Sequence, residues 1–540
     1  MFTREELLAP EYYNMVEEME RYGEDEDRVA LLWENESGDK RVVTYSQLVA
    51  RSNQLANALS KQGIKKGDKL VVLMPKVPET YMIYMAALKM GVILMPGSEL
   101  LTSKDILYRI NHAEAEGILV YHSLADRVDE IRNEALSLKY FITVGGRREG
   151  FLSYEELIDG ESEEFERVNT KSDDIAFISY TSGTTGNPKG VIHHHSWGYA
   201  HQRVAAKAWM DIKEGDVVWA TAGPGWAKWV WSPFVSTLSS GAIGFHYFGR
   251  FNPEKYLQLI DQYKVNVLCC TPTEYRLMAK VDHLDRFSLS SLHSAVSAGE
   301  PLNREVIETF KKYFGVEVRD GYGQTENSLL IGNLKGAKIK PGSMGKPSPG
   351  NWIGIIDEEG NLVPRGVVGD IALHRSAPTL FKGYYRDPER TKMAFRGDWY
   401  VTGDQAMEDE EGYYWFEGRA DDIIISAGYT IGPFEVEDAL VKHEAVKECA
   451  VVASPDEIRG SIVKAFVVLK DPTSIQGEGR AETLIKELQE HVKKITAPYK
   501  YPREIEFVED LPKTTSGKIR RVELRKMERE KKLKGENEIR

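Results

Sequence analysis

Short apolar runs alternate with helical patterns near the N-terminus, and this alternation limits the possible folds more than any other feature of the chain. Leu70–Met74 and Val92–Met95 are continuously apolar, which is typical of strands buried on both faces of a parallel sheet. Two helical segments alternate with them, Thr44–Gly63 with a capping threonine and a final glycine, and Glu79–Met90. Because parallel strands need long crossovers, we predict an α/β fold with helices on both faces of the sheet.

The length of the chain and changes in its sequence pattern predict several domains. A chain of 540 residues is too long for one hydrophobic core. The helix–strand alternation recurs over residues 216–330, whereas short alternating segments between glycines and prolines predict an antiparallel or barrel-like β subdomain at about 340–418. A charged stretch at Gly418–Asp422 precedes a compact segment of mixed helix and strand patterns. We place a large N-terminal domain at 1–420 and a small α+β C-terminal domain at 421–540.

Charge and cysteine content argue against several classes of protein. A formal net charge of −13 disfavours general binding to nucleic acids or anionic membranes, which needs a basic surface. The adjacent Cys269 and Cys270 end the mostly apolar run Val265–Cys270, which predicts a buried strand in a reducing compartment and neither a disulfide framework nor a zinc site. Met1–Glu6 lacks the apolar segment of a secretory signal, and no run approaches the ~18 apolar residues of a membrane span. We expect a cytoplasmic protein without stable membrane insertion.

The stretch Tyr180–Gly190 has a strongly biased composition, with the sequence Tyr-Thr-Ser-Gly-Thr-Thr-Gly-Asn-Pro-Lys-Gly. Glycines let backbone N–H groups approach an anion, hydroxyls add hydrogen-bond donors, and lysine adds a positive charge. The apolar run Asp174–Ser179 before it predicts a buried strand. The stretch is not a Walker A loop, because Pro188 precedes Lys189 and Gly190 follows it. We predict a phosphate-binding loop; the alternative is an ordinary Gly/Thr turn between strands.

Five further motifs place acids, aromatic rings or basic residues beside glycines or in turns. They are Ser297–Leu302, Asp320–Glu326, Tyr400–Asp404, Gly418–Ile424 and Pro512–Arg520. Each alone is weak evidence, because acids flanked by glycine are common at turns. Together and in this order they resemble the AMP-forming adenylating superfamily, which contains acyl-CoA synthetases, carrier-protein adenylation domains and luciferases. The resemblance spans roughly residues 30 to 525 and is greatest to the medium-chain acyl-CoA synthetases and their acetyl-CoA synthetase relatives.

The resemblance implies an acid–thiol ligase whose partners are the small molecules ATP, a carboxylic acid and coenzyme A. In this chemistry the carboxylate attacks the α-phosphate of ATP to give an acyl-adenylate and pyrophosphate, and the CoA thiol then displaces AMP. Because one anion attacks another, the protein must supply charge neutralisation and positioning. The resemblance also implies Mg²⁺, carried by Glu326. The motifs indicate no particular oligomeric state.

The resemblance further implies which residues bind the nucleotide. Tyr322 would stack on adenine, and Asp404 would accept hydrogen bonds from both ribose hydroxyls. Arg419 would support the ribose or the phosphates, and Thr325 would contact the α-phosphate. The stretch from Thr181 to Lys189 would hold the β- and γ-phosphates. The full set for ATP and AMP is Thr181, Ser182, Gly183, Thr184, Thr185, Gly186, Lys189, Gly299, Glu300, Pro301, Asp320, Gly321, Tyr322, Thr325, Asp404 and Arg419.

Lys518 is the residue that the resemblance implies for the first half-reaction. Its ammonium would bridge the substrate carboxylate and the oxygens near the α-phosphate, with Thr325 and Glu326 completing the catalytic set. Lys518 lies more than three hundred residues from the phosphate loop, so the C-terminal domain must fold over the site. Family members rotate this mobile domain between the two half-reactions, and Asp421 matches the hinge; a solvated acidic turn is the alternative there. The channel for CoA would be approached by Ser426, Ala427 and Gly428.

Two positions bear on the identity of the acid. Gly323 stands where acetyl-CoA synthetases carry a tryptophan that blocks the acyl pocket, so a C4–C8 linear or branched acid is favoured over acetate. Trp226 matches an acyl-site position, whereas the other tryptophans of Gly225–Trp231 are attributed to core packing. Lys228 in the same segment has no assigned role. The predicted function is therefore an AMP-forming acyl-CoA synthetase for short- or medium-chain or branched fatty acids.

Several alternatives stay open at this point. The nearest are an acetyl-CoA synthetase, an adenylating enzyme that passes the acyl group to another acceptor, and a luciferase-type oxygenase. Amino-acid adenylation is disfavoured, because the corresponding stretch offers apolar residues and Lys228 where an aspartate is needed. A non-catalytic nucleotide-binding protein would be favoured if Lys518, Glu326 or Asp404 were missing, and all three are present. His193–His195 suggest a metal site, but consecutive residues of a strand alternate faces, so a structural or CoA-adjacent role is expected.

Overall fold

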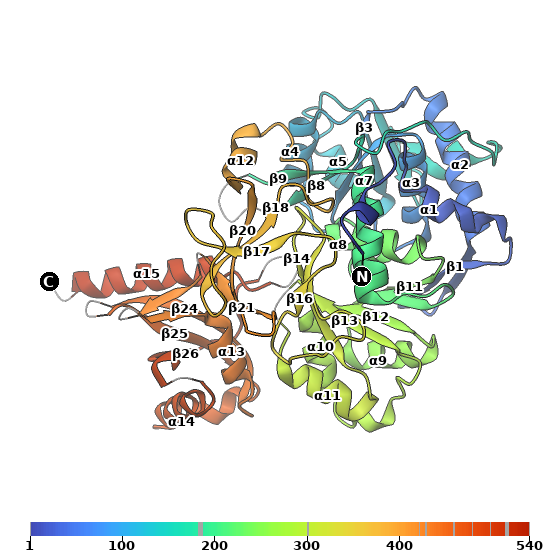
Figure 1. Cartoon of the computed structure of the whole chain (residues 1–540). Coiled ribbons are helices and arrows are strands. Elements are labelled where there is room, and N and C mark those ends of the chain that lie inside the picture. Colours follow the sequence, from blue (N-terminus) through green and yellow to red (C-terminus); the bar gives the residue numbers. More distant parts are fainter. Residues whose placement is uncertain are drawn as a thin grey trace.

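Two bodies of unequal size make up the molecule, which is described by a computed structural model. The structure describes residues 2–181, 187–299, 302–420, 422–426, 429–456, 459–477, 479–496, 498–513 and 518–538. The larger, N-terminal body lies on the right of Figure 1, and the smaller, C-terminal body lies on the left beside its β-rich part. The predicted α/β architecture with a large N-terminal and a small C-terminal domain is confirmed. A boundary at residue 421 stays a prediction.

The first large sheet contains the strand that leads into the predicted phosphate loop. In the described part of the chain its order is β7-β6-β5-β3-β4-β8-β9. The strands are β3 (Lys69–Leu73), β4 (Ile93–Gly97), β5 (Gly117–Tyr121), β6 (Tyr140–Val144), β7 (Leu152–Ser153), β8 (Ile175–Thr181) and β9 (Lys189–His194). Neighbours are parallel except for β8 and β9, whose antiparallel pairing sets Thr181 opposite Lys189. The two ends of the predicted loop therefore meet at one edge of this sheet.

The second large sheet has a parallel centre and antiparallel edges. Its order over the described residues is β16-β15-β14-β13-β12-β10-β11-β1-β2, and the strands from β14 to β1 are parallel. The strands are β1 (Val29–Asn35), β2 (Lys40–Thr44), β10 (Val217–Ala220), β11 (Ile243–Phe248), β12 (Val267–Cys270), β13 (Ser294–Ala298), β14 (Val318–Gly323), β15 (Leu329–Gly332) and β16 (Lys346–Pro347). Gly299 and Gly323 lie at the carboxyl ends of β13 and β14, where parallel sheets bind their ligands.

Helices cover both large sheets, as the alternation of patterns predicts. The helices of the N-terminal body are α1 (Glu17–Glu20), α2 (Tyr45–Lys61), α3 (Pro78–Lys89), α4 (Ser103–Ala113), α5 (Ala125–Asp129), α6 (Tyr154–Ile158), α7 (His195–His201), α8 (Ala227–Trp229), α9 (Pro253–Gln262), α10 (Pro272–Ala279), α11 (Arg304–Phe314) and α12 (Pro388–Met393), with π-helical η4 (Gln202–Met210) and η5 (Val230–Ser236). Of these, α12 contacts the strand Phe395–Arg396 of the β-rich part. The 3₁₀ turns are Glu5–Leu7, Arg21–Glu24, His122–Leu124, Leu284–Arg286, Pro472–Ile475 and Pro498–Lys500. Within the described ranges, no helix has both the length and the apolar composition that crossing a bilayer requires.

Local sequence signals explain the boundaries of α2. Thr44 Oγ1 accepts a hydrogen bond from the Gln47 amide at 3.2 Å, and Gln47 Oε1 accepts one from the Thr44 amide at 3.0 Å. This reciprocal capping box satisfies two backbone donors that the helix itself leaves unpaired. After the helix, Gly63 adopts a positive φ of 96°, which favours glycine. The helix predicted over Thr44–Gly63 is confirmed.

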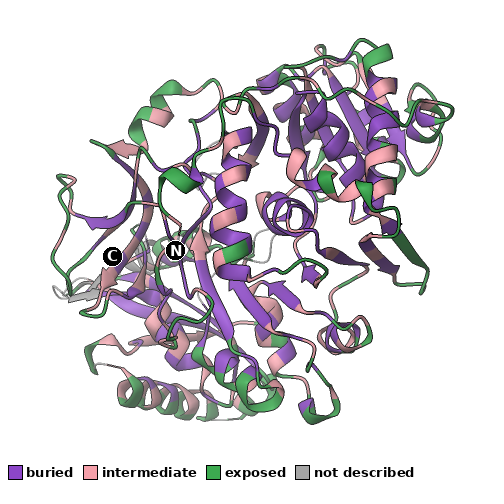
Figure 2. Ribbon diagram, turned by 45° about the vertical axis from the view of Figure 1, so that its right-hand side comes forward, coloured by how far each residue is buried: buried purple, intermediate pink, exposed green. Residues whose placement is uncertain are grey.

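An aromatic core joins the two large sheets. The ring of Tyr84 on α3 lies 4.8 Å from that of Trp229 and 5.4 Å from that of Phe234, and all three are fully buried. Trp231 is also buried, as expected for tryptophans that pack the core. Figure 2 shows most strands of the large sheets in the colour of buried residues, with exposed residues on outer helices, loops and an edge strand. The sheets thus form a rigid base for the strand ends that carry the motifs.

The predicted β-rich subdomain is an antiparallel sheet. Over the residues that the structure describes its order is β17-β18-β20-β19, with β21 added to β20. The strands are β17 (Ile353–Ile356), β18 (Val368–His374), β19 (Phe395–Arg396), β20 (Trp399–Glu408) and β21 (Tyr414–Arg419). The register of β20 and β21 sets Asp404 opposite Arg419. Two motifs of the sequence therefore meet on neighbouring strands.

The C-terminal body has its own small sheet and core. A hairpin of β22 (Ile424–Ser426) and β23 (Tyr429–Ile431) comes first, and β24 (Val446–Asp456), β25 (Gly460–Leu469) and β26 (Glu504–Phe507) form a mixed sheet. The helices are α13 (Pro433–Val441), α14 (Arg480–Ile495) and α15 (Arg521–Glu538). Val436, Leu440, Val451, Val463 and Leu488 are buried between them. This is the mixed α+β unit that the sequence predicts.

Candidate active site

A cavity of about 1160 Å³ lies where the two bodies of the molecule face each other. It brings together residues predicted from distant motifs: Thr181, Lys189, Gly299, Asp320, Gly321, Tyr322, Gly323, Thr325, Glu326, Asp404, Arg419 and Lys518. Among the described residues that line it, twelve are lysine or arginine and seven are aspartate or glutamate. The chain as a whole carries a formal charge of −13. Positive charge is therefore concentrated in the cavity, as an anionic ligand requires.

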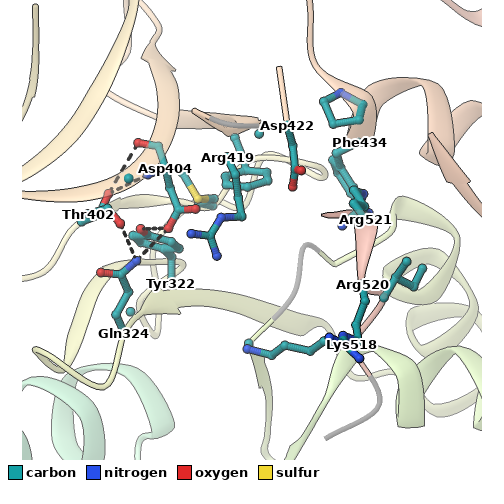
Figure 3. A pocket seen from close by; sticks show the side chains of 18 of the residues that line it. Tyr322, Gln324, Thr402, Asp404, Arg419, Asp422, Phe434, Lys518, Arg520 and Arg521 are labelled. Atoms are coloured by element: carbon teal, nitrogen blue, oxygen red, sulfur yellow. Dashed lines mark hydrogen bonds between the residues drawn. The ribbon is translucent and has the colours of Figure 1, made fainter. Parts of the chain in front are cut away.

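Asp404 is fixed on one wall of the cavity by two side chains of the Asp320–Glu326 motif (Figure 3). Tyr322 Oη donates a hydrogen bond to Asp404 Oδ2 at 2.5 Å, and Gln324 Nε2 donates one to the same oxygen at 2.9 Å. Gln324 Nε2 also donates to the carbonyl oxygen of Thr402 at 2.9 Å. Burial raises the pKa of the Asp404 carboxyl, while the Tyr322 hydrogen bond and the positive charges of Arg419 and Lys518 oppose that rise.

Lys189 and Glu326 meet on another wall of the cavity. Lys189 Nζ lies 3.4 Å from Glu326 Oε1 and donates to Tyr384 Oη at 3.1 Å, while Tyr384 Oη donates to Glu326 Oε1 at 2.8 Å. The backbone explains why Tyr384 lies there, because the Tyr385 amide donates to the carbonyl of Gly190 at 2.7 Å, directly after Lys189. An ammonium and a buried carboxylate are thus held side by side at the end of the phosphate-loop hairpin.

The three consecutive histidines take separate positions. His193 and His194 belong to β9, whereas His195 begins α7. Burial lowers the pKa of His193 and His194 to about 4 and that of His195 to about 3, so all three are neutral at pH 7. His193 Nε2 lies 2.5 Å from the carbonyl oxygen of Thr325 and therefore carries the proton that it donates. Across the described ranges no three histidine, cysteine, aspartate or glutamate side chains gather as a metal site.

The glycines of the Asp320–Glu326 motif are required by close packing. A Cβ atom at Gly321 would lie 2.3 Å from the ring of Trp209, and one at Gly323 would lie 2.0 Å from the carbonyl oxygen of Ser328. Neither position has room for a side chain without movement of the backbone or the ring. Gly323 is therefore explained first by the approach of the β14–β15 connection, independently of any ligand.

Asp320 is buried at the base of the same motif. Its Oδ1 accepts a hydrogen bond from the Gly321 amide at 2.9 Å, and its carbonyl accepts one from Trp209 Nε1 at 3.2 Å. Desolvation by burial raises the pKa of its carboxyl to about 7, against the lowering effect of backbone hydrogen bonds. The carboxyl thus titrates near neutral pH.

Lys518 reaches the cavity from the C-terminal body. It lines the same space as Tyr322 and Asp404, and Figure 3 shows its side chain extending away from Arg520 into that space. Its segment is held by Arg521, whose Nη2 lies 2.6 Å from Glu437 Oε2 on α13. Arg525 forms a further ion pair with Asp422. Residues from both bodies therefore complete one site.

Some predicted site residues lie elsewhere. Trp226 is the half-buried N-cap residue of α8, and Ser426 is buried on β22; neither belongs to the described lining of the cavity. The predicted residues Ser182, Gly183, Thr184, Thr185, Gly186, Glu300, Pro301, Asp421, Ala427 and Gly428 lie outside the described residues.

Two residues that hydrogen-bond to the carboxylates of Asp404 and Glu326 were not predicted from the sequence, Gln324 and Tyr384. Gln324 stands inside the Asp320–Glu326 motif, so its position two residues after Tyr322 was a usable signal. Tyr384 has no motif of its own; it reaches Glu326 because the backbone of Gly383–Tyr385 hydrogen-bonds to β9. A contact between segments so far apart leaves no local pattern in the chain.

Comparisons with known proteins agree with this geometry. The AMP-binding enzyme model matches residues 20–385, and the AMP-binding enzyme C-terminal domain model matches residues 435–518. The chain is 59% identical over 528 residues to YtcI, an uncharacterised acyl-CoA ligase of Bacillus subtilis (strain 168), covering 98% of each chain. It is 43% identical over 535 residues to the mitochondrial acyl-coenzyme A synthetase ACSM3 of Mus musculus, covering 97% of this chain and 92% of the relative.

Solved structures of acyl-CoA ligases share the fold. The anthranilate CoA ligase AuaEII in complex with anthranoyl-AMP matches with a TM-score of 0.90 and 31% identity, over 97% of this chain and 99% of that one. A benzoate CoA ligase from Burkholderia xenovorans LB400 matches with a TM-score of 0.82 and 31% identity, over 95% of this chain and 100% of that one. The family matches, the full-length relatives and the composition of the cavity agree with one another. The chain belongs to the AMP-forming acyl-CoA ligase family of AMP-binding enzymes.

Proposed function

We propose that this ligase activates a short- or medium-chain or branched carboxylic acid, forming acyl-CoA, AMP and pyrophosphate from the acid, ATP and CoA. The observation that carries the proposal is that Tyr322, Asp404, Glu326 and Lys518, from four separate segments, line one cavity enriched in basic residues. The buried, free cysteines Cys269, Cys270 and Cys449 fit a reducing cytoplasm as the place of the reaction.

The nucleotide is held by the large body. Asp404 accepts the ribose hydroxyls, since two hydrogen bonds to its Oδ2 fix its orientation and a carboxylate has further lone pairs to offer. Tyr322 stacks on adenine above Gly299, and Arg419 on the strand beside Asp404 supports the ribose or the phosphates. Thr325, held at its carbonyl by His193, contacts the α-phosphate. Asp320 and Gly321 shape the floor of this pocket.

The phosphate end of ATP lies at the β8–β9 hairpin in this proposal. Lys189 and Thr181 line the cavity there, and the Lys189 ammonium transfers from Glu326 to the phosphates when ATP binds. Glu326 fits a Mg²⁺ ligand, because its buried carboxylate faces the cavity and this ion usually takes one or two carboxylates together with phosphate oxygens and waters. When held there, Mg²⁺ would supply positive charge that offsets the negative charge of the phosphates.

Lys518 acts in the first half-reaction. Its ammonium bridges the acid carboxylate and the α-phosphate oxygens, so that one carboxylate oxygen bonds to phosphorus while the bond to pyrophosphate breaks. In the second half-reaction the C-terminal domain rotates about Asp421, and Ser426, Ala427 and Gly428 approach the pantetheine channel. The thiol then loses its proton, its sulfur bonds to the acyl carbon, and AMP leaves with the former carboxylate oxygen.

The proposed range of acids rests on the start of the acyl pocket. Gly323 lines the cavity directly after Tyr322, at the position where the resemblance places the pocket-blocking tryptophan of acetyl-CoA synthetases, and a glycine carries no side chain that could fill the cavity there. Trp226 is the second proposed pocket residue. The pocket therefore accommodates an acid longer than acetate, in the range C4–C8. Because two structural relatives are benzoate and anthranilate CoA ligases, aromatic acids belong in the same test.

A substrate panel tests the proposal. The purified protein is incubated with ATP, Mg²⁺, CoA and one acid at a time, using linear and branched acids from C2 to C12 together with benzoate and anthranilate. Chromatography measures acyl-CoA and separates AMP from ADP. We expect equal amounts of acyl-CoA and AMP, with a C4–C8 acid well above acetate. Formation of ADP, or AMP without acyl-CoA, would overturn the reaction; preference for acetate would overturn the acid range.

A further inference from the structure

Asn303 does not behave as its position at the start of a helix predicts. It is the N-cap residue of α11, with extended backbone angles of φ −73° and ψ 143°, yet its side chain makes no capping hydrogen bond. Asparagine is among the preferred N-cap residues because its side-chain oxygen accepts from a backbone amide of the first turn. Asn252 does so at the start of α9, where its Oδ1 accepts from the Lys255 amide at 2.9 Å. The side chain of Asn303 instead hydrogen-bonds to two other side chains.

The Asn303 amide connects the two bodies of the molecule. Its Oδ1 accepts a hydrogen bond from Arg276 Nη1 at 3.3 Å, and its Nδ2 donates one to Asp438 Oδ1 at 3.1 Å. Arg276 belongs to α10 of the large body, whereas Asp438 belongs to α13 of the C-terminal body. With a guanidinium on one side and a carboxylate on the other, one orientation of the amide satisfies both neighbours. A neutral amide therefore carries a charge-assisted hydrogen bond across the interface.

The contact lies at the wall of the cavity, between a buried Asn303 and a half-buried Asp438 that also pairs with Lys442 Nζ at 3.0 Å. Asn303 is 3% exposed, and both Asn303 and Arg276 line the cavity that holds Lys518. Nearby, Lys280 Nζ donates to the carbonyl of Lys447 on β24 at 3.3 Å, a second link between the bodies. Because water is largely excluded from Asn303, loss of its hydrogen bond to Asp438 is not fully compensated by solvent.

Helix α13 transmits this contact to Lys518. Glu437, the residue before Asp438, is 7% exposed and binds the Arg521 guanidinium with both carboxylate oxygens. Arg521 Nη2 donates to Oε2 at 2.6 Å, and Arg521 Nε donates to Oε1 at 3.0 Å. Its Oε1 also accepts from the Val451 amide at 2.8 Å. Arg521 follows Lys518 by three residues, so the orientation of α13 determines where Lys518 lies. Asn303 of the large body hydrogen-bonds to Asp438, and the adjacent Glu437 binds Arg521, three residues after Lys518.

We propose that the Asn303–Asp438 hydrogen bond is a latch that holds the C-terminal body in the orientation in which Lys518 faces the nucleotide site. Asn303 and Asp438 are positioning residues, because they act on Lys518 through α13 and the Glu437–Arg521 ion pair. The inference rests on the proposed function and deepens it. The latch is closed for formation of the acyl-adenylate and opens for transfer to CoA. Weakening it therefore slows the first half-reaction and spares the second.

The variant Asn303→Asp separates the latch from the stability of the fold. An aspartate at this position still accepts from Arg276 and is an equally good N-cap for α11. It also sets a second carboxylate against Asp438, which replaces attraction by repulsion. We expect acid-dependent pyrophosphate release to fall about fivefold or more, while thioester formation from preformed acyl-adenylate and CoA is unchanged or faster.

The swap and a matched control complete the experiment. In the double variant Asn303→Asp with Asp438→Asn, the amide at 438 donates to the new carboxylate, and pyrophosphate release should recover. Asn252→Asp makes the same exchange at the N-cap of α9, away from the interface, and should leave both half-reactions and the melting temperature unchanged. A wild-type protein without acid-dependent pyrophosphate release would refute the proposed function. If the wild type is active, three results would refute the latch. The Asn303→Asp variant could lose both half-reactions equally, it could lose neither, or the second substitution Asp438→Asn could fail to restore pyrophosphate release.

Discussion

The hydroxyl of Tyr322 lies 2.5 Å from Asp404 Oδ2 and joins two motifs that are 82 residues apart in the chain. Tyr322 stands at the carboxyl end of β14 in the large sheet, and Asp404 stands on β20 of the β-rich subdomain. The bond therefore ties these two parts of the large body together at the cavity. It also fixes the aromatic ring proposed for adenine relative to the carboxylate proposed for ribose.

Removing this hydroxyl tests the proposed ribose site. Tyr322→Phe keeps the ring but loses the hydrogen bond to Asp404, so we expect the KM for ATP to rise about three- to tenfold with a smaller change in kcat. The bond lowers the pKa of Asp404, so its loss raises that pKa and moves the acidic limb of kcat/KM to higher pH. Rate measurements from pH 5 to 8 check both effects. An unchanged KM and an unchanged acidic limb would argue against this role for the pair.

The carboxylate of Glu326 is the proposed contact for Mg²⁺. Glu326→Gln keeps an oxygen that can accept from Tyr384 but removes the negative charge. We expect kcat/KM to fall about 10- to 100-fold and half-saturation by Mg²⁺ to shift to higher concentration. Titration of the initial rate with Mg²⁺ measures this shift. Tyr384→Phe, which removes one hydrogen bond and leaves the carboxylate, is the matched control; an equal effect in both variants would contradict a metal role.

The elements that position the site follow from local patterns in the sequence. Capping residues and apolar periodicity predict α2, and continuous apolar runs predict β3 and β4, because both signals depend on neighbours within a few residues. The apolar run before Tyr180–Gly190 predicts a buried strand, which is β8, and the described ends of the stretch meet between β8 and β9. That the stretch binds phosphate stays a prediction. The motifs at Asp320–Glu326 and Tyr400–Asp404 converge as their resemblance to known enzymes implies.

Contacts between distant segments could not be predicted in this way. Tyr384 reaches Glu326 through backbone hydrogen bonds to β9, and Asn303 reaches Asp438 across the interface of the two bodies. Neither residue belongs to a periodic pattern, and an asparagine before a helix predicts an ordinary cap. The reason for Gly323 is also tertiary, since the Ser328 carbonyl occupies the place of a side chain.

Because the pKa of Asp320 is raised, we expect the stability difference between wild type and Asp320→Asn to depend on pH. Its pKa is about 7 in the folded protein against about 3.9 in an unfolded chain, so its contribution to stability is complete below pH 4 and is lost as pH rises through 7. Asp320→Asn does not ionise and keeps an acceptor for the Gly321 amide. The variant should gain about 2.6 kcal/mol relative to wild type between pH 5 and pH 8. Melting temperatures at both pH values measure this gain; a constant difference would show that Asp320 does not titrate in this range.

Substitution of Gly323 distinguishes two reasons for a glycine at this position, close packing of the backbone and the size of the acyl pocket. In Gly323→Ala the new Cβ would lie 2.0 Å from the Ser328 carbonyl oxygen, so the β14–β15 connection must shift. We expect the free energy of unfolding to fall by about 1–3 kcal/mol, with a lower melting temperature. The loss of activity should be similar for all acids. Thermal unfolding and the C2–C12 acid panel measure both effects. A variant of normal stability with a selective loss of longer acids would instead assign Gly323 to acyl selection alone.

Comparison of the two half-reactions in Lys518→Ala tests whether the Lys518 ammonium acts in formation of the acyl-adenylate. Acid-dependent pyrophosphate release and thioester formation from preformed acyl-adenylate with CoA are measured on the same preparation, with Lys526→Ala on the exposed side of α15 as control. We predict that Lys518→Ala lowers pyrophosphate release by about 100-fold or more, while thioester formation largely survives and the control behaves as wild type. An equal loss of both half-reactions in Lys518→Ala would show that Lys518 has no specific role in formation of the acyl-adenylate.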